Sequence, residues 1–455
     1  MSGRIDFTLD FKTRATKHKR NPDSQYRIYI LGCFSGRSDS EETPCKIHKI
    51  ERDNFEQVMA DIAPLVEIDD SISLSFASLD DFHPDAWLHK VAIINELLTL
   101  RGQLQSPLTA SKAAAKIQTF VSSETATKVA ESINVAESQD DMLQRLLGKR
   151  PEILPPATDG LEGFIKSMVA PHATQQALPE YQQLIEIIEN TIGQFARDIL
   201  HNQKFQNLEA LWRSLEWLLN EEVAERHNFY LLDIGQGELS TEINIDSKAF
   251  TQTLQQHIQK FDDQQDVLLV GDFCFSGNAD DNELMVYCAN LAERCNAQFL
   301  AAVDQAFLQK MPEVDENHKA AATSSLMLAY PRYLLRLPYG NKRDPIDTIA
   351  FEEFSAPPKM QELLWGNAAF VVARVLLRMA DDDASADAQF FSDTPAFSFT
   401  KDGESTLQSG TEVVLTETQA NGLLERGIMP LIGYQQQRGI RLLGLTSFLI
   451  DYQIG

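Results

Sequence analysis

The sequence predicts an α/β (mixed α+β) protein made of two modules, each with a mixed β-sheet flanked by helices, and a helical connecting region. Strand-like and helix-like runs alternate along the second half of the chain, which is typical of an α/β layer. Pro151–Gly160 (PEILPPATDG) is the most linker-like stretch, because its prolines and glycine interrupt regular structure. A chain of 455 residues has room for two or three domains. We therefore expect a basic arm over 1–24, a first module over 25–150, a linker over 151–160 and a second module over 161–455.

The N-terminal arm inverts the charge of an otherwise acidic chain, and a breaker, Asn21-Pro22-Asp23, follows it. It is either a solvated, mobile terminus or an element that docks on the acidic surface of a neighbouring subunit. Its cations are Lys12, Arg14, Lys17, Lys19 and Arg20.

The first module is expected to start with two strands and a helix. Tyr26–Leu31 (YRIYIL) alternates like a strand, and a glycine turn follows it. Ile72–Phe76 gives a second alternating run. Ser78–Asp85 supplies capping residues and a proline in the first turn, which predicts one helix continuing through Trp87 to Arg101.

The second module is expected to open with helices over about residues 161–220, where apolar side chains recur at spacings of three and four. A short strand at Val267–Val270 is expected to end in Gly271-Asp272. The other expected elements are a strand at Phe229–Ile234, a helix at Phe250–Phe261, a helix at Glu283–Cys295, a strand at Gln298–Val303, and strands at Thr411–Leu415 and from Met429 onward around one helix.

One internal echo links the two modules. Tyr29–Gly36 (YILGCFSG) and Leu269–Gly277 (LVGDFCFSG) share a strand, a glycine and a Phe-Ser-Gly end. Strands followed by glycine are common, so the echo alone is weak evidence that the modules are related.

Composition restricts the function. The net charge of −26 repels nucleic acid and anionic lipid, so no nucleic-acid partner is expected. No run approaches the roughly 20 apolar residues of a membrane span, and the N-terminus lacks a signal-peptide pattern. We therefore predict a cytoplasmic protein without membrane insertion. Its cysteines form no CxxC pair, which argues against a zinc site and for reduced, mostly buried thiols; they are Cys33, Cys45, Cys274, Cys288 and Cys295.

The sequence names no active site, and we expect no enzyme activity, cofactor or metal. It contains no phosphate-binding loop, zinc-protease motif or nucleophile elbow. Asp80, Asp81, His83 and Asp85 resemble a metal cluster, but these residue types at a helix start are the ones that capping selects.

Two further candidates for chemistry are weaker. Cys33 and His48 could act as nucleophile and base, yet nothing in the sequence orients the histidine or lowers the thiol pKa. Asp272 follows a predicted strand, where α/β enzymes place catalytic groups. Without a partner base, a turn-stabilising role is the better interpretation.

Leu328–Gly340 (LAYPRYLLRLPYG) concentrates the side chains that anchor interfaces. Arginine and tyrosine are enriched at interface centres, and arginine pairs with carboxylates through two hydrogen bonds. The arginines either make internal ion pairs or contact a neighbouring subunit. Together with one arginine of the preceding helical stretch, the candidate interface residues are Arg213, Arg332, Tyr333, Arg336 and Tyr339.

Several segments also resemble a known family, the contractile sheath proteins of type VI secretion systems. The first module resembles the small sheath subunit through Ile30–Gly36, Glu51–Ala60 and Ser78–Asp85. The second module resembles the large sheath subunit in colinear order over most of its length. The segments are His201–Leu215, Val270–Phe273, Tyr330–Arg332, Arg336–Gly340, Phe351–Glu353, Trp365–Ala369, Thr411–Val413 and Arg426–Leu431.

The resemblance implies a sheath-like fold and a mechanical role. In that family the small and large subunits form one building block, which polymerises around an inner tube; contraction drives the tube outward and an unfoldase ATPase recycles the sheath. The implied partners are copies of the chain or other sheath subunits, and also inner-tube and baseplate proteins and the unfoldase.

Three departures from the family pattern qualify this expectation. Both subunits are on one chain, which makes their pairing intramolecular. Cys33 stands where the small-subunit motif usually has Asp. The sequence ends soon after Met429–Leu431, so it is expected to lack the C-terminal extension that links sheath subunits by strand addition. Two functions follow as hypotheses: a fused sheath protomer, or an adaptor or cap that seeds or limits polymerisation.

Overall fold

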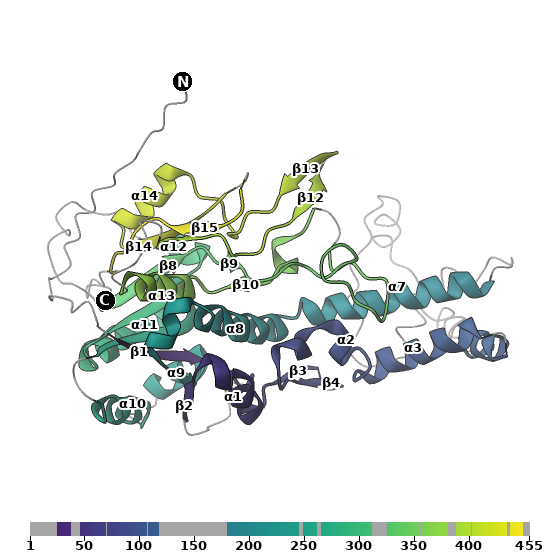
Figure 1. Ribbon diagram of the computed structural model, residues 1–455, viewed down its shortest axis with the longest axis horizontal. Coiled ribbons are helices and arrows are strands. Elements are labelled where there is room, and N and C mark those ends of the chain that lie inside the picture. Colours follow the sequence, from purple (N-terminus) through teal and green to yellow (C-terminus); the bar gives the residue numbers. More distant parts are fainter. Residues whose placement is uncertain are drawn as a thin grey trace, which may run out of the picture.

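One nine-stranded sheet organises the part of the chain that the computed structural model describes (Figure 1). The described residues are 25–37, 46–69, 71–106, 108–117, 180–244, 249–261, 265–311, 325–354, 357–380, 388–401, 403–434 and 437–448. In spatial order, the strands of this sheet are β11 (Phe390–Phe391), β15 (Ile440–Leu442), β14 (Ile428–Gly433), β8 (Leu326–Tyr330), β7 (Ala297–Val303), β6 (Asp266–Phe275), β1 (Tyr26–Gly32), β5 (Asn228–Asp233) and β2 (Ile47–Ile50).

Strand β1 lies inside this sheet rather than in a sheet of its own. It pairs in parallel with β5 on one side and with β6 on the other, so that Tyr29 lies opposite both Tyr230 and Leu269. All seven residues of β1 are buried. The two segments predicted as modules therefore share one sheet, while the predicted arm and linker lie outside the described residues.

Helices cover both faces of the sheet, as the alternation within β1 requires. Ile28 and Ile30 face a core that includes residues of α8 (Gln203–Leu219) and α13 (Ala368–Met379). Tyr29 and Leu31 face the opposite core, to which α9 (Gln236–Asn244), α10 (Ala249–Gln259) and α11 (Ala279–Arg294) contribute. Because successive strand residues point to opposite faces, a central strand between two layers of helices buries side chains on both sides.

Helices α3 (Ala92–Gln105) and α7 (Glu180–Leu200) lie side by side and project from the sheet region (Figure 1). Helix α3 comes from the first predicted module and α7 from the second, so both modules contribute to this projecting pair of helices. The remaining helices and strands are α1 (Phe55–Ile62), β3 (Leu65–Asp69), β4 (Ile72–Ser75), α2 (Pro84–Trp87), α12 (Gln305–Lys310), β9 (Tyr333–Leu334), β10 (Trp365–Gly366), β12 (Ser398–Lys401), β13 (Glu404–Leu407) and α14 (Glu417–Glu425).

The α/β fold class is confirmed, and most predicted elements occur within a few residues of their expected bounds. Three predictions were wrong. The helix expected through Trp87 to Arg101 is broken into a 3-10 turn at Leu79–Phe82, α2 and α3. Strand β6 continues past Gly271-Asp272 to Phe275. Thr411–Leu415 forms no strand, only a bridge from Thr411 to Tyr333.

The echo between β1 and β6 has a structural counterpart. The two strands are parallel neighbours, and each is followed by a glycine with positive φ, Gly36 at +71° and Gly277 at +67°. A side chain is strained in this conformation, which explains glycine there. A Cβ at Gly36 would also lie 2.3 Å from the carbonyl oxygen of Leu65.

No helix in the described ranges has both the length and the apolar character that crossing a membrane requires.

Candidate functional site

The Leu328–Gly340 segment contains a buried ion-pair network. The Arg336 guanidinium donates from Nη1 and Nη2 to both carboxylate oxygens of Glu353, at 2.7 and 2.9 Å, and from Nε to Glu209 at 2.8 Å. Glu209, on α8, also accepts from Nε of Arg213 at 2.8 Å. Glu209 is 0% exposed and Glu353 1%. Two guanidiniums thus neutralise two carboxylates that have no access to solvent.

Electrostatics keep Glu209, Arg213 and Arg336 charged. Burial alone would raise the pKa of Glu209, but the nearby Arg336 and Arg213 guanidiniums outweigh it and hold that pKa below its usual range. Burial opposes the charge of Arg336 too, yet Glu209 and Glu353 raise its pKa well above the ordinary value. Removing any one member would leave an unpaired charge in the interior.

The two tyrosines of the candidate interface set face the interior. Tyr333 is 1% exposed and its hydroxyl donates to Ser214 Oγ at 3.3 Å. The Tyr339 ring lies under the Arg336 guanidinium, 4.2 Å from its carbon to the ring centroid. Burial raises the pKa of both phenols. These contacts are internal, one of the two alternatives that the sequence left open.

Arg332 occupies the most accessible position of the set. Its Nε and Nη2 donate to both oxygens of Glu412, at 2.9 and 2.6 Å, and its side chain remains 40% exposed. The structure therefore brings Arg213, Arg336 and Tyr339 together and keeps Arg332 apart. The cations of the predicted arm, Lys12 to Arg20, lie outside the described residues. An intersubunit role for any of these residues stays a prediction.

A cleft of about 960 Å³ opens where β1, β5 and β6 end. The strand order changes direction here, because β5 and β6 lie on opposite sides of β1. Such switch points are the usual ligand sites of open α/β sheets. Arg37 lines the cleft, but Asp233 and Glu238 neutralise its guanidinium.

Burial is the main influence on the shifted titratable groups of this cleft. Burial raises the pKa of the Cys33 thiol to about 12, so this thiol is not a ready nucleophile. Burial also raises the pKa of Asp272 to about 6, and its hydrogen bond with Asn367 only partly opposes this. Asp272 lies within β6 and not in a turn, which corrects its turn-stabilising interpretation; its side chain faces this cleft instead.

The acidic cluster at Ser78–Asp85 caps helices, as expected. Asp81 Oδ2 accepts from the backbone N–H groups of Ala77 and Ser78 at 2.7 and 3.0 Å. Asp85 instead accepts from the distant backbone N–H groups of Asp347 and Thr348. No group of three His, Cys, Asp or Glu side chains in the described part of the chain is arranged to hold a metal ion.

A second buried ion-pair cluster was missed from the sequence. Arg374, on α13, is 5% exposed and pairs with Glu221 and Asp393, while its guanidinium carbon lies 4.0 Å from the centroid of the Trp217 ring. Arg378 pairs with the same Glu221 at 2.9 Å. The available signal was an arginine inside the apolar run Ala368–Leu377, since a cation there must find a buried partner.

Comparison with known proteins identifies the family of this chain. Residues 182–448, more than half of the chain, match the VipB family model, described as EvpB/VC_A0108, tail sheath N-terminal domain. The chain belongs to the VipB family of tail sheath proteins. Residues 2–132 also match the type VI secretion system VipA family, described as VipA, VC_A0107 or Hcp2. The predicted resemblance to both sheath subunits is therefore confirmed.

A relative extends this result. The chain is 24% identical over 322 residues to the type VI secretion system sheath protein TssC1 of Pseudomonas aeruginosa. The alignment covers 61% of this chain and 64% of that protein, so the chain spans less than two thirds of the length of that relative. The VipB-matched region holds both ion-pair clusters, and the VipA-matched region supplies β1 and β2.

Proposed function

We propose that this chain is a structural component of a type VI-like contractile secretion apparatus, a fused sheath protomer that assembles with itself or with other sheath subunits. One observation carries the proposal: β1, from the VipA-matched region, is a central strand of the sheet whose other strands, apart from β2, come from the VipB-matched region. A single chain thereby supplies both a small-subunit-like and a large-subunit-like part of one building block.

The packing of β1 supports a permanent pairing of the two regions. Its backbone is hydrogen-bonded along both edges and its side chains are buried on both faces. Withdrawing it would expose the edges of β5 and β6, which are templates for aggregation. Linkage on one chain keeps the ratio of the two regions at one to one.

The charge distribution supports a mechanical rather than a catalytic role. The buried guanidiniums of Arg336 and Arg374 are tied to carboxylates of the same chain, and burial raises the pKa of the Cys33 thiol in the cleft. Inner-tube and baseplate proteins and a recycling unfoldase are proposed partners on the strength of the family relationship. A cytoplasmic location stays a prediction from the sequence.

Mass measurement across concentration, followed by electron microscopy, tests this function. A sheath protomer should form oligomers or helical polymers, either alone or with other sheath subunits. A strictly monomeric protein that binds no sheath, tube or baseplate protein would refute the proposal.

The family matches do not favour the alternative of an adaptor or cap, and one experiment separates the two. The protein is added at sub-stoichiometric amounts to polymerising sheath subunits. A protomer should be incorporated uniformly without changing polymer length, whereas a cap should shorten the polymers.

A further inference from the structure

A second hollow, away from the sheet-edge cleft, combines aromatic rings with cations. This hollow, the Arg343 pocket, has a volume of about 590 Å³ and lies beside the β12–β13 hairpin. Its walls include Phe354, Phe397 and Phe399. Its charged side chains are Lys342, Arg343, Arg438 and Glu352.

Arg343 is held in place, but no anionic side chain of the described ranges pairs with it. Its guanidinium carbon lies 5.0 Å from the centroid of the Phe354 ring and 5.1 Å from that of Phe397, so two rings support the cation. Its Nη1 is buried and has no hydrogen-bond partner among the described residues. A buried donor left unpaired costs stability, and an incoming carboxylate would supply the acceptor that this guanidinium lacks.

The other charges of the pocket do not supply that acceptor. Glu352 is directed toward the backbone, where its Oε1 accepts from the N–H of Asn341 at 3.2 Å. Lys342 and Arg438 are exposed. In the described ranges, none of the three pocket cations forms an ion pair, although Arg332, Arg336 and Arg374 all do.

We propose that the Arg343 pocket binds a carboxylate-bearing segment of a second copy of this chain. Charge complementarity supports this occupant, because a chain with 66 acidic and 40 basic residues presents mostly carboxylates to its neighbours. Arginine stacked on aromatic rings, surrounded by further cations, is suited to planar carboxylates. The choice of a second copy as the occupant rests on the proposed function, self-assembly. The affinity of the pocket for carboxylates does not depend on that function.

The first test measures binding of fluorescein-labelled hexaglutamate to the full chain by anisotropy, with hexaglutamine as the uncharged control peptide. We expect hexaglutamate alone to bind. Arg343→Gln should weaken binding at least about tenfold, because it removes a charge-assisted bond. The double variant Lys342→Gln/Arg438→Gln should weaken hexaglutamate binding severalfold and reduce the salt dependence of binding. Because both side chains are exposed, we expect the double variant to fold as the unmodified chain does.

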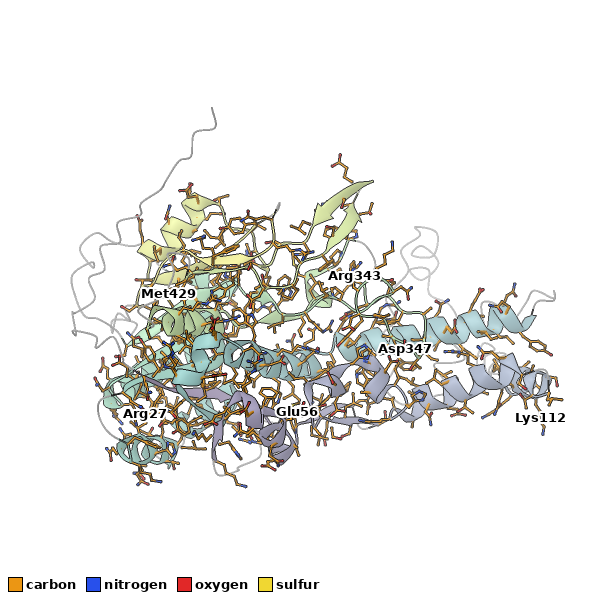
Figure 2. The ribbon with its side chains drawn as sticks, in the orientation of Figure 1. Arg27, Glu56, Lys112, Arg343, Asp347 and Met429 are labelled. Atoms are coloured by element: carbon orange, nitrogen blue, oxygen red, sulfur yellow. The ribbon has the colours of Figure 1, made fainter. Side chains whose placement is uncertain are left out.

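Lys112→Gln is the matched control, since Lys112 is exposed at the far end of the α3 region, distant from Arg343 (Figure 2). It should bind hexaglutamate as the unmodified chain does. If the double variant and Arg343→Gln also bind unchanged, the pocket is not a carboxylate site and the proposal is wrong.

The second test identifies the occupant through self-association, measured by sedimentation velocity. Hexaglutamate should compete with self-association of the unmodified chain, and the double variant should self-associate more weakly than Lys112→Gln. Loss of peptide binding with unchanged self-association would refute the second copy as occupant. A chain that stays monomeric while it binds the peptide would refute the proposed function and this occupant, but not the carboxylate site.

Discussion

Glu353→Gln tests whether the buried network stabilises the fold by charge neutrality. The substitution keeps the size of the side chain but removes one of two negative charges from the set Arg213, Arg336, Glu209 and Glu353. Arg336 then loses its two-bond partner, and the N–H of Tyr339, 2.7 Å from Glu353 Oε2, loses a charged acceptor.

The expected loss follows from burial. Breaking a buried ion pair by removing one partner costs about 3–5 kcal/mol. Because Glu209 still faces Arg336 at 2.8 Å, we expect the low end, about 3 kcal/mol. An exposed pair provides the contrast: Lys359, 76% exposed, lies 3.7 Å from Glu362, so Lys359→Ala should cost less than about 1 kcal/mol.

Urea unfolding followed by tryptophan fluorescence, to which Trp212 and Trp217 on the same helix as Glu209 contribute, measures both changes. Glu353→Gln should lower the midpoint of the transition that exposes α8 without changing its slope. Adding Arg336→Met should recover part of the loss, because the unpaired cation is removed. A Glu353→Gln variant no less stable than Lys359→Ala would refute the reasoning.

Three further predictions concern the cleft, the core and the chain connection. Burial raises the pKa of Asp272 from 3.8 to about 6, so the free energy of unfolding falls as pH rises between these values. In thermal melts, Asp272→Asn should therefore be more stable than the unmodified chain by about 1–3 kcal/mol at pH 7, and no more stable below pH 4. Phe34→Ala removes a fully buried ring 5.1 Å from Trp212 and should cost about 3–5 kcal/mol in urea unfolding; Val414→Ala, 40% exposed, should change stability by less than about 0.5 kcal/mol, and equal costs would contradict this core assignment. Fragments 1–150 and 161–455 should co-purify when they are co-expressed, because β1 lies between β5 and β6. Fragment 161–455 alone should aggregate, because the edges of β5 and β6 are then unpaired. If light scattering and urea titration show that this fragment is monomeric and unfolds cooperatively, β1 is dispensable for folding.

Local signals in the sequence predicted most elements correctly. The alternation at Tyr26–Leu31 and the apolar spacing along Phe205–Leu218 are visible without any partner, and both elements occur. The prediction for Ser78–Arg101 was wrong because capping signals mark a helix start but not the turns after Trp87. At Thr411–Leu415, β-branched residues suggested a strand, yet only Thr411 finds a bridging partner.

The candidate site was predicted in part. The segment holding Arg332 and Arg336 was found from its composition, because arginine and tyrosine are typical anchors of interfaces. The carboxylate partners of these arginines were not predicted, since Glu209 lies 127 residues from Arg336 and Glu412 lies 80 residues from Arg332. No spacing rule joins positions so far apart.

The sequence by itself therefore determined the α/β class, the strand and helix periodicities, the acidic charge and the resemblance to both sheath subunits. Only the tertiary structure decided that β1 enters the sheet between β5 and β6 and which carboxylates neutralise Arg336. It also decided that, among the residues it describes, no carboxylate pairs with Arg343. The physical reason is the same in each case. Local propensity selects the conformation of a segment, whereas parallel pairing and buried ion pairs depend on residues that come together only when the whole core is packed.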